Sequence, residues 1–248
     1  MLWHKAWRES RIRFLLIALF ILSYCVYAVL TQETSRASFS PRGALVMVNL
    51  SYPAYVYMSI YGKAAFAFLL FCPALLSMGG LLRERGYGTA ILSLCLPVSR
   101  HKLTAVRAAV GLLEVASLAF IPAVVIAALS PMVGESYPIS VALHFALLWA
   151  VCGSAFFATS FLFSVAIGGT YSALVVSFIS VYLYAFVTSL RPTRFGLSEI
   201  IGGINKPIRD RLFTGLPDPL PWGTLLIVAA VSFALLVTAA RITERQDF

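Results

Sequence analysis

Charged residues are scarce in this chain. Asp, Glu, Lys and Arg make up 12% of its 248 residues, whereas a soluble globular domain carries about 25%. Hydrophobic residues make up 60%. A chain with so little charge and so much apolar surface is not typical of a soluble domain. The composition therefore predicts an integral membrane protein.

Several catalytic patterns are also missing. The sequence contains no G-x-x-x-x-G-K-[ST], no H-E-x-x-H and no G-x-S-x-G. ATP binding by a P-loop and the common intramembrane or lipid hydrolases therefore lack support. The four cysteines show no C-x-x-C spacing, and the three histidines lie far apart in sequence. We expect no catalytic residue, no metal site and no enzyme activity in this chain.

Uncharged runs predict six membrane-spanning helices. A helix needs about 20 apolar residues, at 1.5 Å each, to cross roughly 30 Å of hydrocarbon. Four runs of this size lie between Arg13 and Glu33, between Lys63 and Arg83, between Glu114 and Glu135 (with the span beginning near Leu103), and from Pro219 to Ala240. The long run between Glu135 and Arg191 holds two more spans. We place the break between them at Ile167–Thr170, because paired glycines favour a turn.

The basic residues predict the orientation. The N-terminal segment carries Lys5, Arg8, Arg11 and Arg13 against the single acid Glu9, which favours the cytoplasmic side. An even number of spans places both termini there. We expect the cytoplasmic membrane of a bacterium or archaeon. The net charge of +9 flanks apolar spans, so attraction to lipid headgroups explains it better than nucleic-acid binding.

The predicted fold is an all-α polytopic membrane protein, with residues 1–248 forming one transmembrane domain. Residues 1–13 form either an amphipathic helix in the interface plane or a basic flank with two anchoring tryptophans. The loop Glu33–Gly62 is external, and its four tyrosines form an interfacial belt. The loop 191–221 is external and contains short helices before the last span. Its five basic residues disagree with that side.

One acidic residue lies well inside a predicted span. A charge at membrane depth costs about 2.5–3.5 kcal/mol on insertion scales, so Glu114 needs a partner or water. Arg107 lies seven residues earlier, about 10 Å along the helix axis. The two residues are a candidate intramembrane polar pair. Glu114 either lines a polar cavity or forms a structural ion pair near the inner interface, and we favour the ion pair.

The cytoplasmic segment 83–102 combines charged ends with an apolar middle. Gly86 and Gly88 permit a sharp turn. A short helix over 89–95 ends before Pro97. Pro97 can open the helix that follows, and Ser99 is also available as its cap. Ile91 and Leu94 would be poorly solvated on so short a helix. They pack against this protein's own spans or in the groove of another protein.

This segment resembles the loop between spans two and three in type-2 permeases of the ATP-binding-cassette (ABC) exporter superfamily. Glu84-Arg85, Gly88-Thr89 and Pro97-Val98-Ser99-Arg100 match the family pattern in order and spacing. The resemblance implies a coupling helix that docks on a separate ATPase subunit. Two permeases and two ATPases would form the complex, with ATP and Mg²⁺ on the ATPases and no cofactor here. The implied coupling residues are Glu84, Arg85, Gly88, Thr89, Ile91, Leu94, Pro97 and Arg100.

The leading hypothesis is therefore the permease subunit of an ATP-driven exporter, paired with a second copy of itself. One alternative keeps the ATPase but moves an extracytoplasmic partner in place of a substrate. The other is a secondary transporter, which would place several ionisable groups near the bilayer midplane. Glu114 is the only such group well inside a span.

Overall fold

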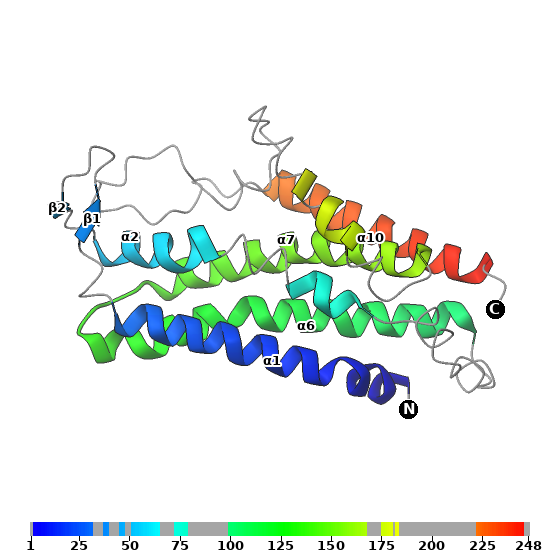
Figure 1. Ribbon diagram of the computed structural model, residues 1–248, viewed down its shortest axis with the longest axis horizontal. Helices are drawn as coiled ribbons and strands as arrows, with labels where there is room; N and C mark the ends of the chain where they lie inside the picture. The colour runs from blue at the N-terminus through cyan, green and yellow to red at the C-terminus, as the bar shows by residue number, and fades with distance from the viewer. Residues whose placement is uncertain are drawn as a thin grey trace.

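The computed structural model describes residues 2–31, 37–39, 45–47, 51–64, 72–78, 99–167, 175–180, 182–183 and 222–245. The described chain is predominantly helical, as predicted (Figure 1). Its long helices are α1 (Leu2–Leu30), α6 (Arg100–Leu129), α7 (Ile139–Ala166) and α10 (Trp222–Arg245). The shorter elements are α2 (Tyr52–Val56), the π-helix η2 (Tyr57–Ala64), the 3₁₀-helix η3 (Ser130–Val133) and the antiparallel strands β1 (Ala37–Phe39) and β2 (Leu45–Met47).

Among the described residues, four helices are long and apolar enough to cross a membrane. They are Leu2–Leu30, His101–Val133, Ile139–Ala166 and Trp222–Arg245. These helices coincide with the predicted first, third, fourth and sixth spans. Only short helical pieces of the second and fifth predicted spans are described, at 72–77 and at 175–180 with 182–183. A membrane protein is the conclusion that this architecture supports, and the count of six spans stays a prediction.

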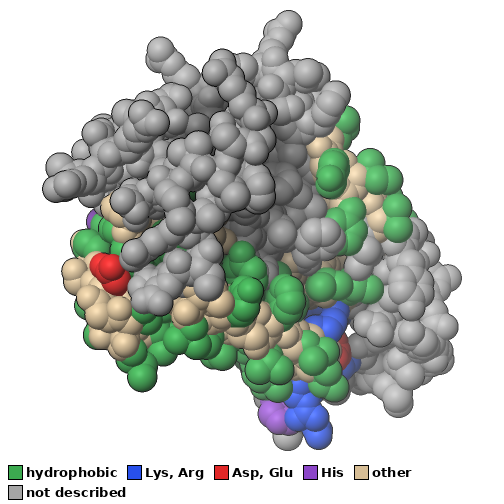
Figure 2. All heavy atoms as spheres, turned by 60° about the vertical axis from the view of Figure 1, so that its left-hand side comes forward, with side chains coloured by type: hydrophobic (Ala, Val, Ile, Leu, Met, Phe, Trp, Pro, Cys, Tyr) green, Lys and Arg blue, Asp and Glu red, His purple; other side chains and the backbone are tan. Residues whose placement is uncertain are grey.

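Helix α6 is the centre of the bundle. It packs against α1, α7 and α10, and α7 packs against α10. The two chain ends lie at the same end of the elongated molecule, where α6 also begins (Figure 1). Hydrophobic side chains cover much of the described surface on one side, and Lys and Arg side chains gather in a small group (Figure 2). This distribution suits a bundle whose sides face apolar surroundings.

Local sequence signals account for the residue at which α6 begins and for the two limits of α7. The Ser99 side chain accepts a hydrogen bond from the Lys102 backbone N–H at 3.4 Å, so Ser99 caps α6 as predicted. Helix α7 ends at Ala166, and Ile167 is extended with φ −107° and ψ 114°. This end coincides with the predicted break before the paired glycines. Pro138, in the β region, is the N-cap of α7.

The N-terminal residues form the first turns of α1 and not a separate helix. Helix α1 runs without interruption from Leu2 to Leu30. Trp3 and Trp7 stay exposed on its early turns. Ser10 is buried, because this face of α1 packs on α6. The beginning of α1 therefore carries interior contacts as well as surface ones.

The prediction that the four tyrosines form an interfacial belt is wrong for Tyr52, Tyr57 and Tyr61. Residues 52–64 are helical, and Tyr52, Tyr57 and Tyr61 are buried. The Tyr61 ring stacks on Phe145 of α7 with a centroid separation of 4.1 Å and meets Trp149 edge-on at 5.6 Å. Tyrosine has a large apolar ring, so it can belong to a core as readily as to an interface. Here α7 supplies aromatic partners that favour the core.

Tyrosine hydroxyls join α2 and η2 to α1 and to η3, which follows α6. Tyr55 donates to the Ala28 carbonyl at 2.7 Å, and Tyr24 donates to the Ser59 carbonyl at 2.8 Å. Tyr52 lies 2.7 Å from the Ser130 hydroxyl, which itself donates to the Ile126 carbonyl. Tyr52 is therefore the donor. Burial raises the pKa of the Tyr52 hydroxyl, so it keeps its proton at neutral pH.

We expect Tyr52→Phe to lower the free energy of unfolding by about 0.5–1.5 kcal/mol, because it leaves a buried hydroxyl without its donor. Tyr27→Phe is the matched control, since Tyr27 is 67% exposed and its loss should have no measurable effect. Thermal unfolding of both variants in one detergent is the measurement. Equal melting temperatures for the two variants would contradict the buried donor.

Close packing of α6 on α7 depends on Gly111. A Cβ atom at this position would lie 2.2 Å from Cζ of Phe157 and 2.5 Å from its Cε2. Phe157 is itself buried and stacks on Phe161 at 5.6 Å, so its ring has little room to move. The glycine allows the two helices to approach.

Gly111→Ala should therefore lower the free energy of unfolding by about 1–3 kcal/mol through overpacking. The control is Gly223→Ala on α10, where an added Cβ has nothing within 4 Å. That variant should be neutral or slightly stabilising, because alanine favours helix. Thermal unfolding compares the two. A melting temperature for Gly111→Ala at or above that of Gly223→Ala would show that the helices are not in close contact there.

Candidate functional site

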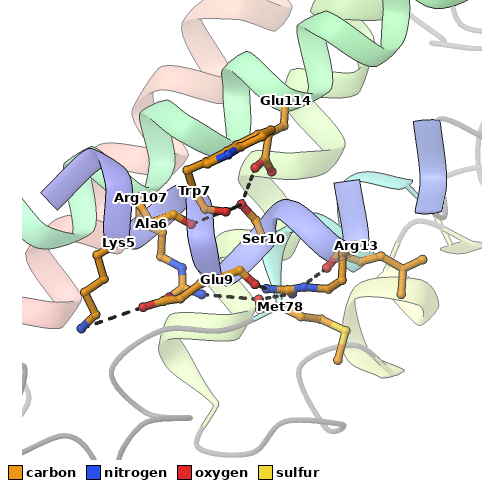
Figure 3. A network of polar contacts seen from close by, with 10 residues as sticks. Lys5, Ala6, Trp7, Glu9, Ser10, Arg13, Met78, Arg107 and Glu114 are labelled. Carbon is orange, nitrogen blue, oxygen red and sulfur yellow. Dashed lines mark hydrogen bonds and ion pairs between the residues drawn. The ribbon is translucent and has the colours of Figure 1, made fainter. Parts of the chain in front are cut away.

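A cluster of polar groups joins α1, α6 and the segment 72–78 at one end of the bundle (Figure 3). We call it the polar clamp. It unites groups that the sequence separates widely, since α1 and α6 each supply side chains and segment 72–78 supplies backbone carbonyls. Its members are Glu9, Ser10, Arg13, Arg107, Glu114 and the carbonyls of Leu75 and Met78.

Arg13 binds the end of segment 72–78. Its Nη1 donates to the Leu75 carbonyl at 3.0 Å and to the Met78 carbonyl. Its Nη2 donates to the Glu9 carbonyl within α1 at 3.1 Å. The last carbonyls of a helix have no partner within the helix, and a cation there also interacts favourably with the helix dipole. Arg13 therefore acts as a side-chain cap on the helical residues 72–77.

Arg107 reaches the same carbonyl from the other helix. Its Nη2 lies 3.4 Å from the Met78 carbonyl oxygen, and its Nη1 lies 3.3 Å from Glu9 Oε2. Glu9 also pairs with Lys5 at 3.8 Å. These ion pairs are partly exposed, so each contributes about 0–1 kcal/mol. Their main effect is positional, because the pair with Glu9 holds the Arg107 guanidinium beside the carbonyl that Arg13 also binds.

Glu114 is the buried acid of the clamp. It is 2% exposed, and its Oε1 accepts a hydrogen bond from the Ser10 hydroxyl. Its Oε2 is buried without a hydrogen-bond partner among the described residues. Arg13 and Arg107 are both close enough to interact with its charge. Arg107 and Glu114 thus belong to one cluster, as the sequence indicated, but the ion pair that Arg107 makes within this cluster goes to Glu9.

Sequence reasoning missed Glu9, Ser10 and Arg13 as partners. Two features of the sequence could have indicated them: their spacing on one helix, and the position of the acid Glu9 within a basic segment. What the sequence could not supply was the register between α1 and α6, which places Ser10 beside a residue 104 positions later. It also gave no reason to expect backbone carbonyls of segment 72–78 as the acceptors.

An apolar cavity lies between α1, α6, α7 and segment 72–78. Its lining includes Ile21, Cys72, Val115, Leu118 and Trp149, and no lining residue is charged. The cavity accordingly offers no charged group for catalysis or for holding a cation.

The described residues contain no group of three or more His, Cys, Asp or Glu placed to hold a metal ion. Cys25, Cys72 and Cys152 are buried free thiols. In apolar surroundings such cysteines behave as small hydrophobic residues.

Most of the predicted coupling residues lie outside the described part of the chain: Glu84, Arg85, Gly88, Thr89, Ile91, Leu94 and Pro97. Arg100 is described as the first residue of α6. The predicted external loop 191–221 also lies outside the described residues. The structure thus gives the two ends that flank residues 79–98, namely Met78 in the clamp and Ser99 at the cap of α6.

No protein-family model matches this chain, and no curated protein matches its sequence.

Proposed function

We propose that this chain is the membrane permease subunit of an ATP-driven ABC exporter. The observation that carries the proposal is the pattern of Glu84-Arg85, Gly88-Thr89 and Pro97-Val98-Ser99-Arg100 in a segment that leads into α6. In this proposal residues 83–102 dock on a separate ATPase subunit, which binds ATP and Mg²⁺. Two permeases and two ATPases form the working complex, and substrate crosses the membrane between the permeases.

The cap of α6 supports this reading of the segment. In the proposed arrangement a break at Pro97 must separate the docking helix from the span that follows. Ser99 adopts a β conformation, with φ −62° and ψ 142°, and α6 begins at the next residue. Ser99 and Arg100, the last two residues of the motif, thus lie at a helix start, where Ser99 has a physical role as the cap.

The polar clamp supports the mechanical part of the proposal. Met78 is the last described residue before residues 79–98. Its carbonyl accepts hydrogen bonds from Arg13 of α1 and Arg107 of α6. A displacement of the docking segment would act on both helices through these bonds. Arg13 and Arg107 would then convert motion of the ATPase into motion of the membrane helices.

Purification of the tagged chain from its native membrane tests the proposal. We expect an ATPase of the ABC class to copurify in equimolar amount and to hydrolyse ATP in the complex. A folded chain that retains no ATPase under mild detergent, with melting behaviour unchanged by nucleotide, would contradict the proposal. Retention of the ATPase without any transported substrate, but with an extracytoplasmic protein bound, would favour the transmitter alternative.

A secondary transporter is the second candidate, because Glu114 is a buried acid within α6, a helix long and apolar enough to cross a membrane. Ion-coupled carriers use such residues to bind the coupling ion. In that case transport in sealed vesicles would follow an imposed ion gradient in the absence of ATP. The proposed exporter instead stops when ATP is withdrawn.

A further inference from the structure

The Lys and Arg residues at the start of α1 divide into two pairs. Lys5 and Arg13 have partners inside the molecule, because Lys5 pairs with Glu9 at 3.8 Å and Arg13 donates to backbone carbonyls. Arg8 and Arg11 are exposed, and within the part of the chain that the structure describes they make no hydrogen bond or ion pair. Contacts inside the molecule therefore account for the first pair and not for the second.

Arg8 and Arg11 lie on one face of α1, three residues apart. Residues at this spacing on a helix are neighbours, with about 5–6 Å between their Cβ atoms, so both guanidinium groups can approach one small anion. The acid nearest to them in sequence is Glu9, which Lys5 and Arg107 already engage. The exposed pair thus carries two positive charges that no acidic side chain among the described residues contacts.

The same face of α1 is apolar directly after Arg11. Exposed hydrophobic side chains continue it at Ile12, Leu15, Leu19 and Leu22. The stretch from Ile12 to Leu22 is about 15 Å long at 1.5 Å per residue, which is half of the roughly 30 Å of hydrocarbon in a bilayer. The face therefore presents charge at one end and apolar surface over the depth of one lipid leaflet.

Tryptophan side chains indicate the same level of the membrane. Trp3 and Trp7 lie in the first two turns of α1 and are exposed. The Trp7 ring lies against Phe14, with a centroid separation of 5.3 Å. Tryptophan is enriched where the membrane meets water. The arginine pair beside Trp7 therefore lies at the depth of the lipid phosphate groups.

We propose that Arg8 and Arg11 bind the phosphate group of an acidic phospholipid, whose acyl chain lies along the exposed apolar face from Ile12 to Leu22. Guanidinium groups bind phosphate through paired N–H donors. A zwitterionic headgroup carries its own cation, so it attracts the pair less. A free phosphate ion would occupy the arginines but leave the apolar face uncovered, so the occupant is a lipid. The site rests on the chain being a membrane protein and not on the exporter proposal.

Photolabelling of the full chain in lipid nanodiscs tests the site. Nanodiscs of phosphatidylcholine receive a trace of phosphatidylglycerol or of phosphatidylcholine, each with a photoreactive group in one acyl chain. Mass spectrometry of peptides then measures the label on residues 12–22. We expect about 30-fold more label from the acidic probe than from the zwitterionic probe, which corresponds to about 2 kcal/mol for the two cations.

Three double variants locate the preference. Arg8→Gln/Arg11→Gln should bring the two probes to equal labelling of residues 12–22. Arg8→Lys/Arg11→Lys should keep most of the preference, because it keeps both charges. Arg241→Gln/Arg245→Gln is the charge-matched control at exposed positions of α10 and should leave the labelling of α1 unchanged. In nanodiscs of phosphatidylcholine alone, Arg8→Gln/Arg11→Gln should melt at the wild-type temperature, which shows that this variant folds.

Glycerol phosphate, added in excess at constant ionic strength, distinguishes a lipid from a free phosphate. It should leave the labelling by the acidic probe unchanged. Loss of the preference on this addition would overturn the assignment to a lipid. Equal labelling of the wild type by the two probes, or an equal loss of preference in the α1 and α10 double variants to glutamine, would overturn the site itself. None of these outcomes involves an ATPase, so the exporter proposal is decided separately by copurification.

Discussion

If residues 83–102 dock as proposed, Leu94→Asp should release the ATPase subunit while this chain stays inserted and folded. Leu94 lies in the apolar middle of residues 83–102, where we propose that it enters a groove of the ATPase. Transferring a neutral polar group into such a contact without a partner costs roughly 2–7 kcal/mol, and an ionised carboxylate costs more. Binding should therefore weaken by about 100-fold or more, since each 1.4 kcal/mol is a factor of ten.

The control for this variant is Leu94→Met, which keeps an apolar side chain of similar volume and should retain the ATPase. Glu84→Gln should differ from both variants. It keeps the size of the side chain but removes a charge that we assign to the register of the contact. Loss of one member of a desolvated charge pair costs about 2–5 kcal/mol, so transport should fall and ATP hydrolysis should continue uncoupled. Copurified ATPase and substrate export are the two measurements, and wild-type values for all three variants would rule out a docking role.

Among substitutions at the partly exposed residues of α1, Arg13→Gln should lower the free energy of unfolding the most. The substitution removes donors from the Leu75 and Met78 carbonyls and from the Glu9 carbonyl. Hydrogen bonds to charged groups contribute about 1.5–3 kcal/mol each. We expect a loss of about 2–4 kcal/mol, less than the sum, because water replaces part of the contact.

Arg11→Gln is the matched control on the same helix. It makes the same change of charge at an exposed position, so its effect should stay within about 0.5 kcal/mol. Arg13→Lys separates charge from geometry, because one ammonium cannot reproduce the planar array of guanidinium donors. Thermal unfolding in nanodiscs measures all three. Similar melting temperatures for Arg13→Gln and Arg11→Gln would show that the clamp does not hold segment 72–78.

Some features of this chain follow from its sequence because they depend on neighbouring residues. The cap by Ser99, one of the two starts that the sequence left open for α6, and the end of α7 before Gly168-Gly169 are local signals, and the structure confirms both. The four long helices follow from uninterrupted apolar runs, whose length a membrane sets directly.

Other features depend on how distant segments meet. A tyrosine ring suits a membrane interface and a core equally well, and the aromatic partners on α7 that decide between them lie far along the sequence. The clamp is similar, because Glu9, Ser10 and Arg13 acquire their role only through the register of α1 against α6. Arg107 and Glu114 could be named from one helix, but the Glu9 partner of Arg107 could not.

Site-specific photo-crosslinking tests the central claim most directly. A photoreactive amino acid is placed at position 94, within the predicted docking segment, and separately at position 132, where Met132 of η3 is 78% exposed. In native membranes, the account predicts a crosslink from position 94 to an ATPase of the ABC class, and none from position 132. A position-94 variant that inserts normally but captures no ATPase, or equal capture from both positions, would contradict the proposal that residues 83–102 couple this chain to an ATPase.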